Sequence, residues 1–181
     1  MVIDSVILAG WIAFWAYWLV TAANVKAGRT RSGRFVGFRI AASLLILLLI
    51  RLRVLHGQVV THNPWLQAIG LVVFVLGLAL AVWARIYIGR NWGMPMSEKV
   101  DGQLVTTGPY HFIRHPIYSG IILGVVGTAI AASLFWLVAV VLLGAYFIYC
   151  AVMEERYMTQ VFPDAYPAYR RSTKMLIPFI V

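Results

Sequence analysis

Three long apolar stretches alternate with polar segments along the chain: Ile3–Ala23, Trp65–Ala84 and Ile117–Met153. The second and third contain no charged residue. A helix needs about 20 apolar residues to cross a bilayer, so each stretch is long enough to do so. The first lacks a preceding Lys or Arg and exceeds a signal-peptide core in length, which favours a retained span.

The stretch Ile117–Met153 is too long for one crossing. Its 37 residues would form a helix of about 55 Å, whereas the hydrocarbon core is about 30 Å thick. The sequence therefore predicts two antiparallel helices that turn near residues 131–133.

A further span, Phe35–Leu55, is expected from the distribution of cations. Its uncharged centre, Ile40–Ile50, is short and flanked by arginines that must reach the interfaces. With five spans, 13 of the 15 Lys and Arg residues fall on one face, which marks that face as cytoplasmic. The pattern predicts an all-α integral membrane protein with five transmembrane helices, located in the plasma (inner) membrane with its C-terminus in the cytoplasm.

Two expectations concern the polar segments. The stretch Arg85–His115, rich in Gly, Pro, Asn and Ser, is expected to be mostly loop. The tail Glu154–Val181 is expected to be amphipathic, to follow the last helix and to pack at the cytoplasmic membrane surface.

Composition narrows the function classes. Apolar residues make up 62% of the chain and charged residues only 12%, against about 25% in a soluble domain, which excludes disorder and a typical soluble enzyme. The net charge of +9 reflects topology rather than nucleic-acid binding, because the cations lie between apolar spans. The single cysteine, Cys150, excludes an intrachain disulfide. His111 and His115 have helical spacing, but Pro116 interrupts that helix and no third ligand is evident, so no metal site is predicted.

Two polar clusters are expected to meet at the ends of the helical hairpin. Arg114 and His115 precede Pro116, which suits the first turn of a helix, so free N–H groups and a partial positive charge are expected there. Glu154 and Glu155 are expected at the end of the returning helix, where the helix dipole disfavours carboxylates. Residues that stand where local physical preferences disfavour them often have a functional role.

A zwitterionic ligand fits between two such clusters. S-adenosylmethionine has a carboxylate for the Arg/His end, an ammonium for the Glu end, and a sulfonium that aromatic faces attract. Four aromatic residues are candidates for that contact: Trp92, Tyr110, Tyr118 and Tyr157.

Plainer alternatives remain open for the single residues. Arg114 also fits a membrane-interface anchor, and His115 fits a structural cap. The aromatic residues of the tail segment 162–169 also fit interfacial packing.

Three motifs resemble the isoprenylcysteine carboxyl methyltransferase family, whose core is shared by phospholipid methyltransferases. They are GRNW at 89–92, QLVTTGPY at 103–110, and RHPIYSG at 114–120, followed after the hairpin by the Glu154–Glu155 pair. The resemblance covers residues 65–181, which we therefore expect to form a methyltransferase core preceded by an N-terminal part, residues 1–64.

The resemblance implies that S-adenosylmethionine binds at the cytoplasmic edge of a five-helix fold. The residues it implies as cofactor-binding are Gly102, Gln103, Leu104, Val105, Tyr110, His115, Pro116, Ile117, Tyr118 and Glu154. Arg114 is expected to orient the donor carboxylate or an anionic head group, and Glu155 to act as base for an amine acceptor.

Two departures from the family pattern bear on the substrate. The family often has His where Gly102 stands, so that contact is expected from the backbone. Eukaryotic prenylcysteine enzymes have an Arg one turn before the first Glu, where this chain has Cys150. The departure at Cys150 weakens the case for a prenylcysteine carboxylate but does not affect the methyl donor.

The predicted function is S-adenosylmethionine-dependent methyl transfer to the carboxyl oxygen or amine nitrogen of a lipophilic acceptor, which is a lipophilic small molecule, a lipid or a prenylated peptide. Two alternatives stay open: a nicotinamide-dependent reductase of the sterol-reductase-like type, and a non-catalytic helical scaffold. The chain lacks a Gly-rich phosphate loop, which disfavours the reductase.

Overall fold

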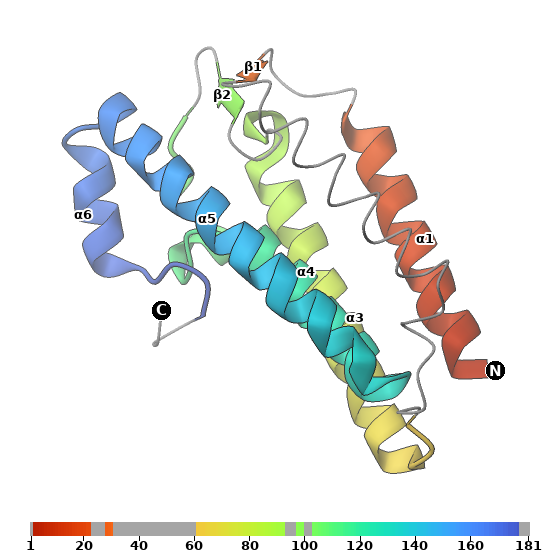
Figure 1. The fold of residues 1–181 in the computed structure, drawn as a ribbon. Helices are drawn as coiled ribbons and strands as arrows, with labels where there is room; N and C mark the ends of the chain where they lie inside the picture. The colour runs from red at the N-terminus through yellow and green to blue at the C-terminus, as the bar shows by residue number, and fades with distance from the viewer. Residues whose placement is uncertain (1, 23–27, 31–60, 93–96, 100–102, 178–181) are drawn as a thin grey trace.

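Helices account for most of the described chain in the computed structural model, which describes residues 2–22, 28–30, 61–92, 97–99 and 103–177 (Figure 1). The α-helices are α1 (Val2–Ala22), α3 (Pro64–Ile88), α4 (Pro116–Ala131), α5 (Leu137–Val161) and α6 (Ala165–Ser172). Three short 3-10 helices are η2 (Gly89–Asn91), η3 (Gly108–His111) and η4 (Leu134–Trp136). Two strands, β1 (Gly28–Thr30) and β2 (Ser97–Lys99), form an antiparallel pair that the sequence did not predict.

Three of the described helical segments are long and apolar enough to cross a membrane: Val2–Thr21, Pro64–Asn91 and Leu134–Val161. The shorter apolar helix α4 packs antiparallel to α3. These segments confirm the predicted first and third spans. The predicted hairpin is also confirmed, since α4 ends at Ala131 and the Ser133 side chain accepts a hydrogen bond at the start of η4.

The predicted second span, 35–55, lies outside the described residues. The residues on either side of it lie at opposite ends of the bundle (Figure 1). Thr30 pairs with Ser97 near the C-terminal end of α3, whereas the Thr61 amide donates to the Ala132 carbonyl beyond the far end of α4.

Small residues bring α3 and α4 into backbone contact. A Cβ atom added at Gly120 would lie 2.6 Å from both the Ala81 nitrogen and the Gly77 oxygen. The same holds at Gly127, where it would lie 2.6 Å from the Gly70 oxygen. Since lipid surrounds these helices, close packing of this kind replaces the hydrophobic effect as the source of association.

Helix α1 packs on this pair through aromatic and polar contacts. Trp11 Nε1 donates to Thr128 Oγ1 at 3.1 Å, and Trp18 packs edge-to-face on Trp92 with ring centroids 6.0 Å apart. The buried Arg85 donates at 2.8 Å to the Thr21 carbonyl, which lies at the C-terminal end of α1. Its cation therefore faces the negative end of the helix dipole.

Two expectations about element boundaries are wrong. The segment expected to be loop from Arg85 begins inside α3, which continues to Ile88 because Arg85 is buried against α1 and Trp92. Glu154 and Glu155 do not end the returning helix, since α5 continues to Val161 and stops at Phe162, the residue before Pro163. A residue that precedes proline is disfavoured in helical conformation. The helix-dipole argument for the Glu pair therefore does not apply.

Candidate active site

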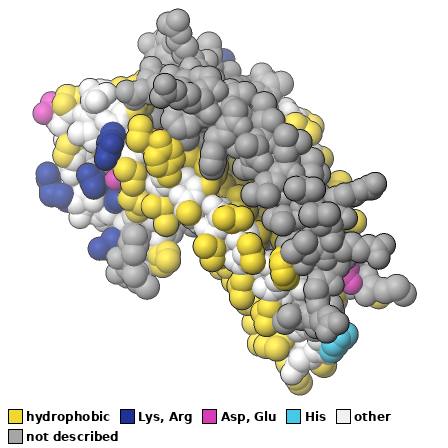
Figure 2. All heavy atoms as spheres, in the orientation of Figure 1, with side chains coloured by type: hydrophobic (Ala, Val, Ile, Leu, Met, Phe, Trp, Pro, Cys, Tyr) yellow, Lys and Arg dark blue, Asp and Glu magenta, His cyan; other side chains and the backbone are white. Residues whose placement is uncertain are grey.

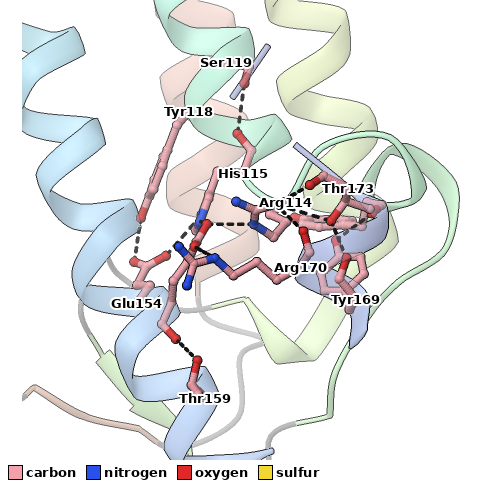
Figure 3. Close-up of polar contacts among 11 residues, drawn as sticks. Arg114, His115, Tyr118, Ser119, Glu154, Thr159, Tyr169, Arg170 and Thr173 are labelled. Carbon is pink, nitrogen blue, oxygen red and sulfur yellow. Dashed lines mark hydrogen bonds and ion pairs between the residues drawn. The ribbon is translucent and has the colours of Figure 1, made fainter. Parts of the chain in front are cut away.

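The hydrophilic end of the helical hairpin gathers three segments (Figure 3). The start of α4, the last turns of α5, and α6 with the residues after it meet there, and most of the charged contacts in the described chain lie among them. The predicted meeting of Arg114 and His115 with Glu154 and Glu155 is therefore confirmed.

Glu155 is the centre of a buried charge network. Its Oε1 atom lies 2.7 Å from Arg114 Nε and 3.4 Å from His115 Nε2, and its Oε2 atom lies 3.3 Å from Arg170 Nε. Only 4% of the Glu155 side chain is exposed. A carboxylate this buried is tolerated because cations surround it.

Glu154, the next residue, is more accessible. The Tyr118 hydroxyl donates to its Oε1 atom at 2.6 Å, and its Oε2 atom lies 3.6 Å from His115 Nδ1. Its side chain is 27% exposed. The two adjacent carboxylates thus differ in kind: Glu155 is enclosed by protein, whereas Glu154 is hydrogen-bonded to Tyr118 and partly exposed.

A stack of aromatic rings connects α4 to α5 beside Glu154. The His115 and Tyr118 rings are parallel within 2°, with centroids 5.4 Å apart. The Tyr118 and Phe147 rings lie 4.6 Å apart at 15°. The stack orients the Tyr118 hydroxyl toward Glu154, as Figure 3 shows.

The segment after α6 is hydrogen-bonded along the start of α4. The amides of Arg114 and His115 donate to the carbonyls of Lys174 at 2.8 Å and Met175 at 3.1 Å. Ser119 Oγ donates to the Leu176 carbonyl at 2.5 Å. The amides of Arg114 and His115 are therefore not free, because a distant part of the chain occupies them.

Arg114 is directed at the protein rather than at open space. Besides Glu155, its guanidinium donates to the carbonyls of Thr173 and Arg170, and its side chain is 8% exposed. It joins α4, α5 and the end of α6 (Figure 3).

The other predicted site residues lie around this network. Tyr110 is buried, its hydroxyl donates to the Ala84 carbonyl at 3.4 Å, and its own carbonyl accepts from Tyr169 at 2.5 Å. Pro116 is fully buried at the first turn of α4, and Ile117 packs against the core. Residues 103–105 form the extended segment that leads into η3, and Gly102 lies outside the described residues.

Burial suppresses the acidity of the tyrosines that flank the network. It raises the pKa of Tyr169 to about 12 and holds the pKa values of Tyr110 and Tyr166 well above the usual range. Their hydroxyls therefore stay neutral near pH 7 and act as hydrogen-bond donors.

Sequence reasoning missed three contributors to this site: Arg170, Thr173 and Phe147. All three reach it from sequence-distant positions, and Arg170 and Thr173 do so through the tail. A plain pattern of apolar and polar residues contains no signal for such contacts.

Two further observations concern metal binding and cavities in the described part of the molecule. Among the described residues, no group of three His, Cys, Asp or Glu side chains is arranged to hold a metal ion. A hollow of about 290 Å³ lies at the opposite end of the bundle, between the start of α1 and the α4–η4 turn. It is lined by Val2, Ile3, Asp4, Thr61, His62, Gln67, Ala131 and Ala132.

Comparison with known protein families shows to which family this chain belongs. The family model described as phospholipid methyltransferase matches residues 65–165, more than half of the chain and most of the site. The chain belongs to this family. Its members include membrane methyltransferases, so the predicted resemblance is confirmed.

Two groups of relatives share this core: proteins named for metal resistance and proteins named as isoprenylcysteine O-methyltransferases. The cobalt-zinc-cadmium resistance protein CzcN of Cupriavidus metallidurans is 29% identical over 143 residues, which cover 77% of this chain and 63% of that protein. Protein-S-isoprenylcysteine O-methyltransferase B of Arabidopsis thaliana is 29% identical over 120 residues, which cover 64% of this chain and 61% of that protein. The chain thus spans about three fifths of the length of these relatives.

A solved structure has the same fold. The eukaryotic intramembrane Ras methyltransferase ICMT (isoprenylcysteine carboxyl methyltransferase) superposes with a TM-score of 0.59 and 26% identity. The match covers 84% of this chain and 55% of that one. Together with the apolar helices, this match identifies a multi-pass integral membrane protein.

Proposed function

We propose that this protein is an S-adenosylmethionine-dependent methyltransferase that acts on a membrane-embedded lipophilic acceptor at the cytoplasmic face. The observation that carries the proposal is the accessible carboxylate of Glu154, held by Tyr118 and His115 at the hydrophilic end of a methyltransferase-family bundle.

The side chains present fit this methyl donor. Glu154 offers a carboxylate to an ammonium group, and the aromatic stack beside it offers ring faces to a sulfonium. We propose that residues 102–105 and Tyr110 surround the rest of the donor. S-adenosylmethionine supplies an already activated methyl group, so the protein has mainly to align the partners and exclude water.

The network around Glu155 supports a positioning role for Arg114. Because its guanidinium is committed to Glu155 and to backbone carbonyls, Arg114 holds α4, α5 and the tail in register rather than contacting the donor. His115 and Glu154 depend on that register, since both contact the same network.

The same network bears on the acceptor. An amine acceptor releases a proton, and Glu155, the expected base, is enclosed by Arg114, His115 and Arg170. The arrangement therefore favours a carboxylate acceptor, which needs no base. Cys150 is buried in the apolar core, so the counter-charge for that carboxylate must come from elsewhere than this turn of α5.

Isothermal titration calorimetry with S-adenosylhomocysteine tests the donor assignment on the purified protein. We expect micromolar binding by the wild type and affinity about tenfold weaker for Glu154→Gln, because one charge-assisted contact is lost. Asp164→Asn, which removes an exposed carboxylate just before α6, is the matched control and should bind like the wild type.

Two results would oppose the proposal. Binding of NADPH without binding of S-adenosylhomocysteine would favour the reductase, and binding of neither would favour a scaffold. Unchanged affinity in Glu154→Gln would remove Glu154 from the donor site. The acceptor is identified separately, by the mass gain of one methylene on an extracted lipid or prenylated peptide after incubation with the donor.

A further inference from the structure

The end of α6 carries a concentrated positive charge outside the proposed donor site. We define the basic patch as Arg170, Arg171 and Lys174, all three exposed. Arg171 and Lys174 form no ion pair within the described part of the chain, and Figure 2 shows dark blue side chains gathered at this end of the molecule. Neighbouring cations that lack a neutralising carboxylate, as Arg171 and Lys174 do among the described residues, repel one another unless an anion lies among them.

The position of α6 indicates where such an anion comes from. Figure 1 shows α6 beside the last turns of α5, off to one side of the bundle rather than beyond its end. Tyr166 is buried beneath the helix, and the apolar side chains of α5 continue from this level along the bundle (Figure 2). An amphipathic helix placed beside a membrane-spanning helix lies at the depth of the lipid head groups.

Arg170 connects the basic patch to the charge network. Its Nε atom lies 3.3 Å from Glu155 Oε2, while 59% of its side chain is exposed. A guanidinium has five N–H donors, so Arg170 can keep the Glu155 contact and also bind a phosphodiester oxygen. The Arg170 carbonyl also accepts from Arg114, which fixes the end of α6 to the network.

From these observations we propose that the basic patch binds the phosphate of an anionic lipid and that this binding stabilises the Arg114–Glu155 network. The lipid is a component of the membrane distinct from the methyl acceptor. The effect on the donor site rests on the proposed function, whereas lipid binding itself does not.

Native mass spectrometry of the full chain in detergent tests the lipid site. The protein is titrated with phosphatidylglycerol or with zwitterionic phosphatidylcholine. We expect tighter binding of phosphatidylglycerol, weakened about fivefold by Arg171→Gln or Lys174→Gln and about 30-fold by both together. Arg90→Gln, which removes an exposed cation at the end of α3, is the control and should bind like the wild type.

The coupling is tested in nanodiscs with and without phosphatidylglycerol. The lipid should raise the melting temperature of the wild type and its affinity for S-adenosylhomocysteine, but not those of the Arg171→Gln, Lys174→Gln double variant. Equal binding of both lipids, equal weakening by Arg90→Gln, or full competition by millimolar inorganic phosphate would overturn the lipid site. Absence of S-adenosylhomocysteine binding in every nanodisc would instead count against the proposed function, and the lipid titration would still stand.

Discussion

Two adjacent glutamates on one helix have opposite environments, and that difference is the main feature of the site at the residue scale. Glu155 is enclosed by Arg114, Arg170 and the His115 ring, whereas Glu154 is held by a tyrosine and is partly exposed. The sequence predicted that both would face Arg114 and His115, which is correct. It could not separate their roles, because adjacent helical residues differ by only about 100° in direction and the partners lie on other elements.

Loss of the buried carboxylate should reduce stability. Glu155→Gln leaves Arg114 without its charge partner in a buried position, and breaking a buried pair costs about 3–5 kcal/mol. Chemical denaturation in detergent measures the change in the free energy of unfolding, with Asp164→Asn as the control. A loss no greater than that of the control would contradict the central place of Glu155.

The Tyr118 hydroxyl should affect ligand binding more than stability. Tyr118→Phe keeps the ring between His115 and Phe147 but removes the donor to Glu154. We expect weaker binding of S-adenosylhomocysteine by calorimetry, with a change in unfolding free energy of about 1 kcal/mol. Tyr118→Leu, which removes the ring as well, should lose both binding and stability. Equal binding by Tyr118→Phe and wild type would exclude a role for the hydroxyl.

Alkaline pH should weaken the attachment of α6. Burial raises the pKa of Tyr169 from 10.0 to about 12 in the folded protein. The folded state therefore keeps the hydroxyl neutral at pH values where the unfolded chain ionises, so its contribution is present below pH 10 and is lost as pH rises toward about 12. The melting temperature should fall less steeply over this range in Tyr169→Phe than in the wild type. Parallel slopes would show that Tyr169 does not contribute.

At the scale of elements, the α3–α4 pair depends on glycine. Gly120→Ala places a Cβ atom 2.6 Å from backbone atoms of α3, which cannot move away as a side chain can. We expect a loss of about 1–3 kcal/mol. Gly144→Ala on α5 has no neighbour within 4 Å and should be neutral or stabilising, because alanine favours helix. Thermal unfolding in detergent compares the two, and equal effects would contradict the close packing.

Some boundaries of the elements follow from the sequence, and others do not. The charge-free run from Ile117 predicts the hairpin, because length and bilayer thickness allow only two short helices there. The Glu pair does not mark the end of α5, because the helix continues to Val161, close to Pro163, which cannot extend it. The tail's hydrogen bonds to the start of α4 join residues about 60 positions apart through backbone atoms, which leave no pattern in side-chain types.

For the whole molecule, the bundle separates an apolar membrane-spanning part from one charged end. Arg114, His115, Glu154 and Arg170 come together there from three elements, and the family match extends over most of them. The hollow at the opposite end has a lining of mixed polar and apolar side chains and lies apart from this charged end. The proposed function therefore depends on which end of the bundle holds the methyl donor.

Photo-crosslinking tests this placement most directly. Purified protein is irradiated with tritiated S-adenosylmethionine, with and without excess S-adenosylhomocysteine, and the labelled peptides are mapped by mass spectrometry. We expect competable label within residues 103–118 or in the part of α5 that carries Glu154, reduced in Glu154→Gln but not in Asp164→Asn. Competable label in residues 2–4 or 61–67, or none anywhere, would contradict it.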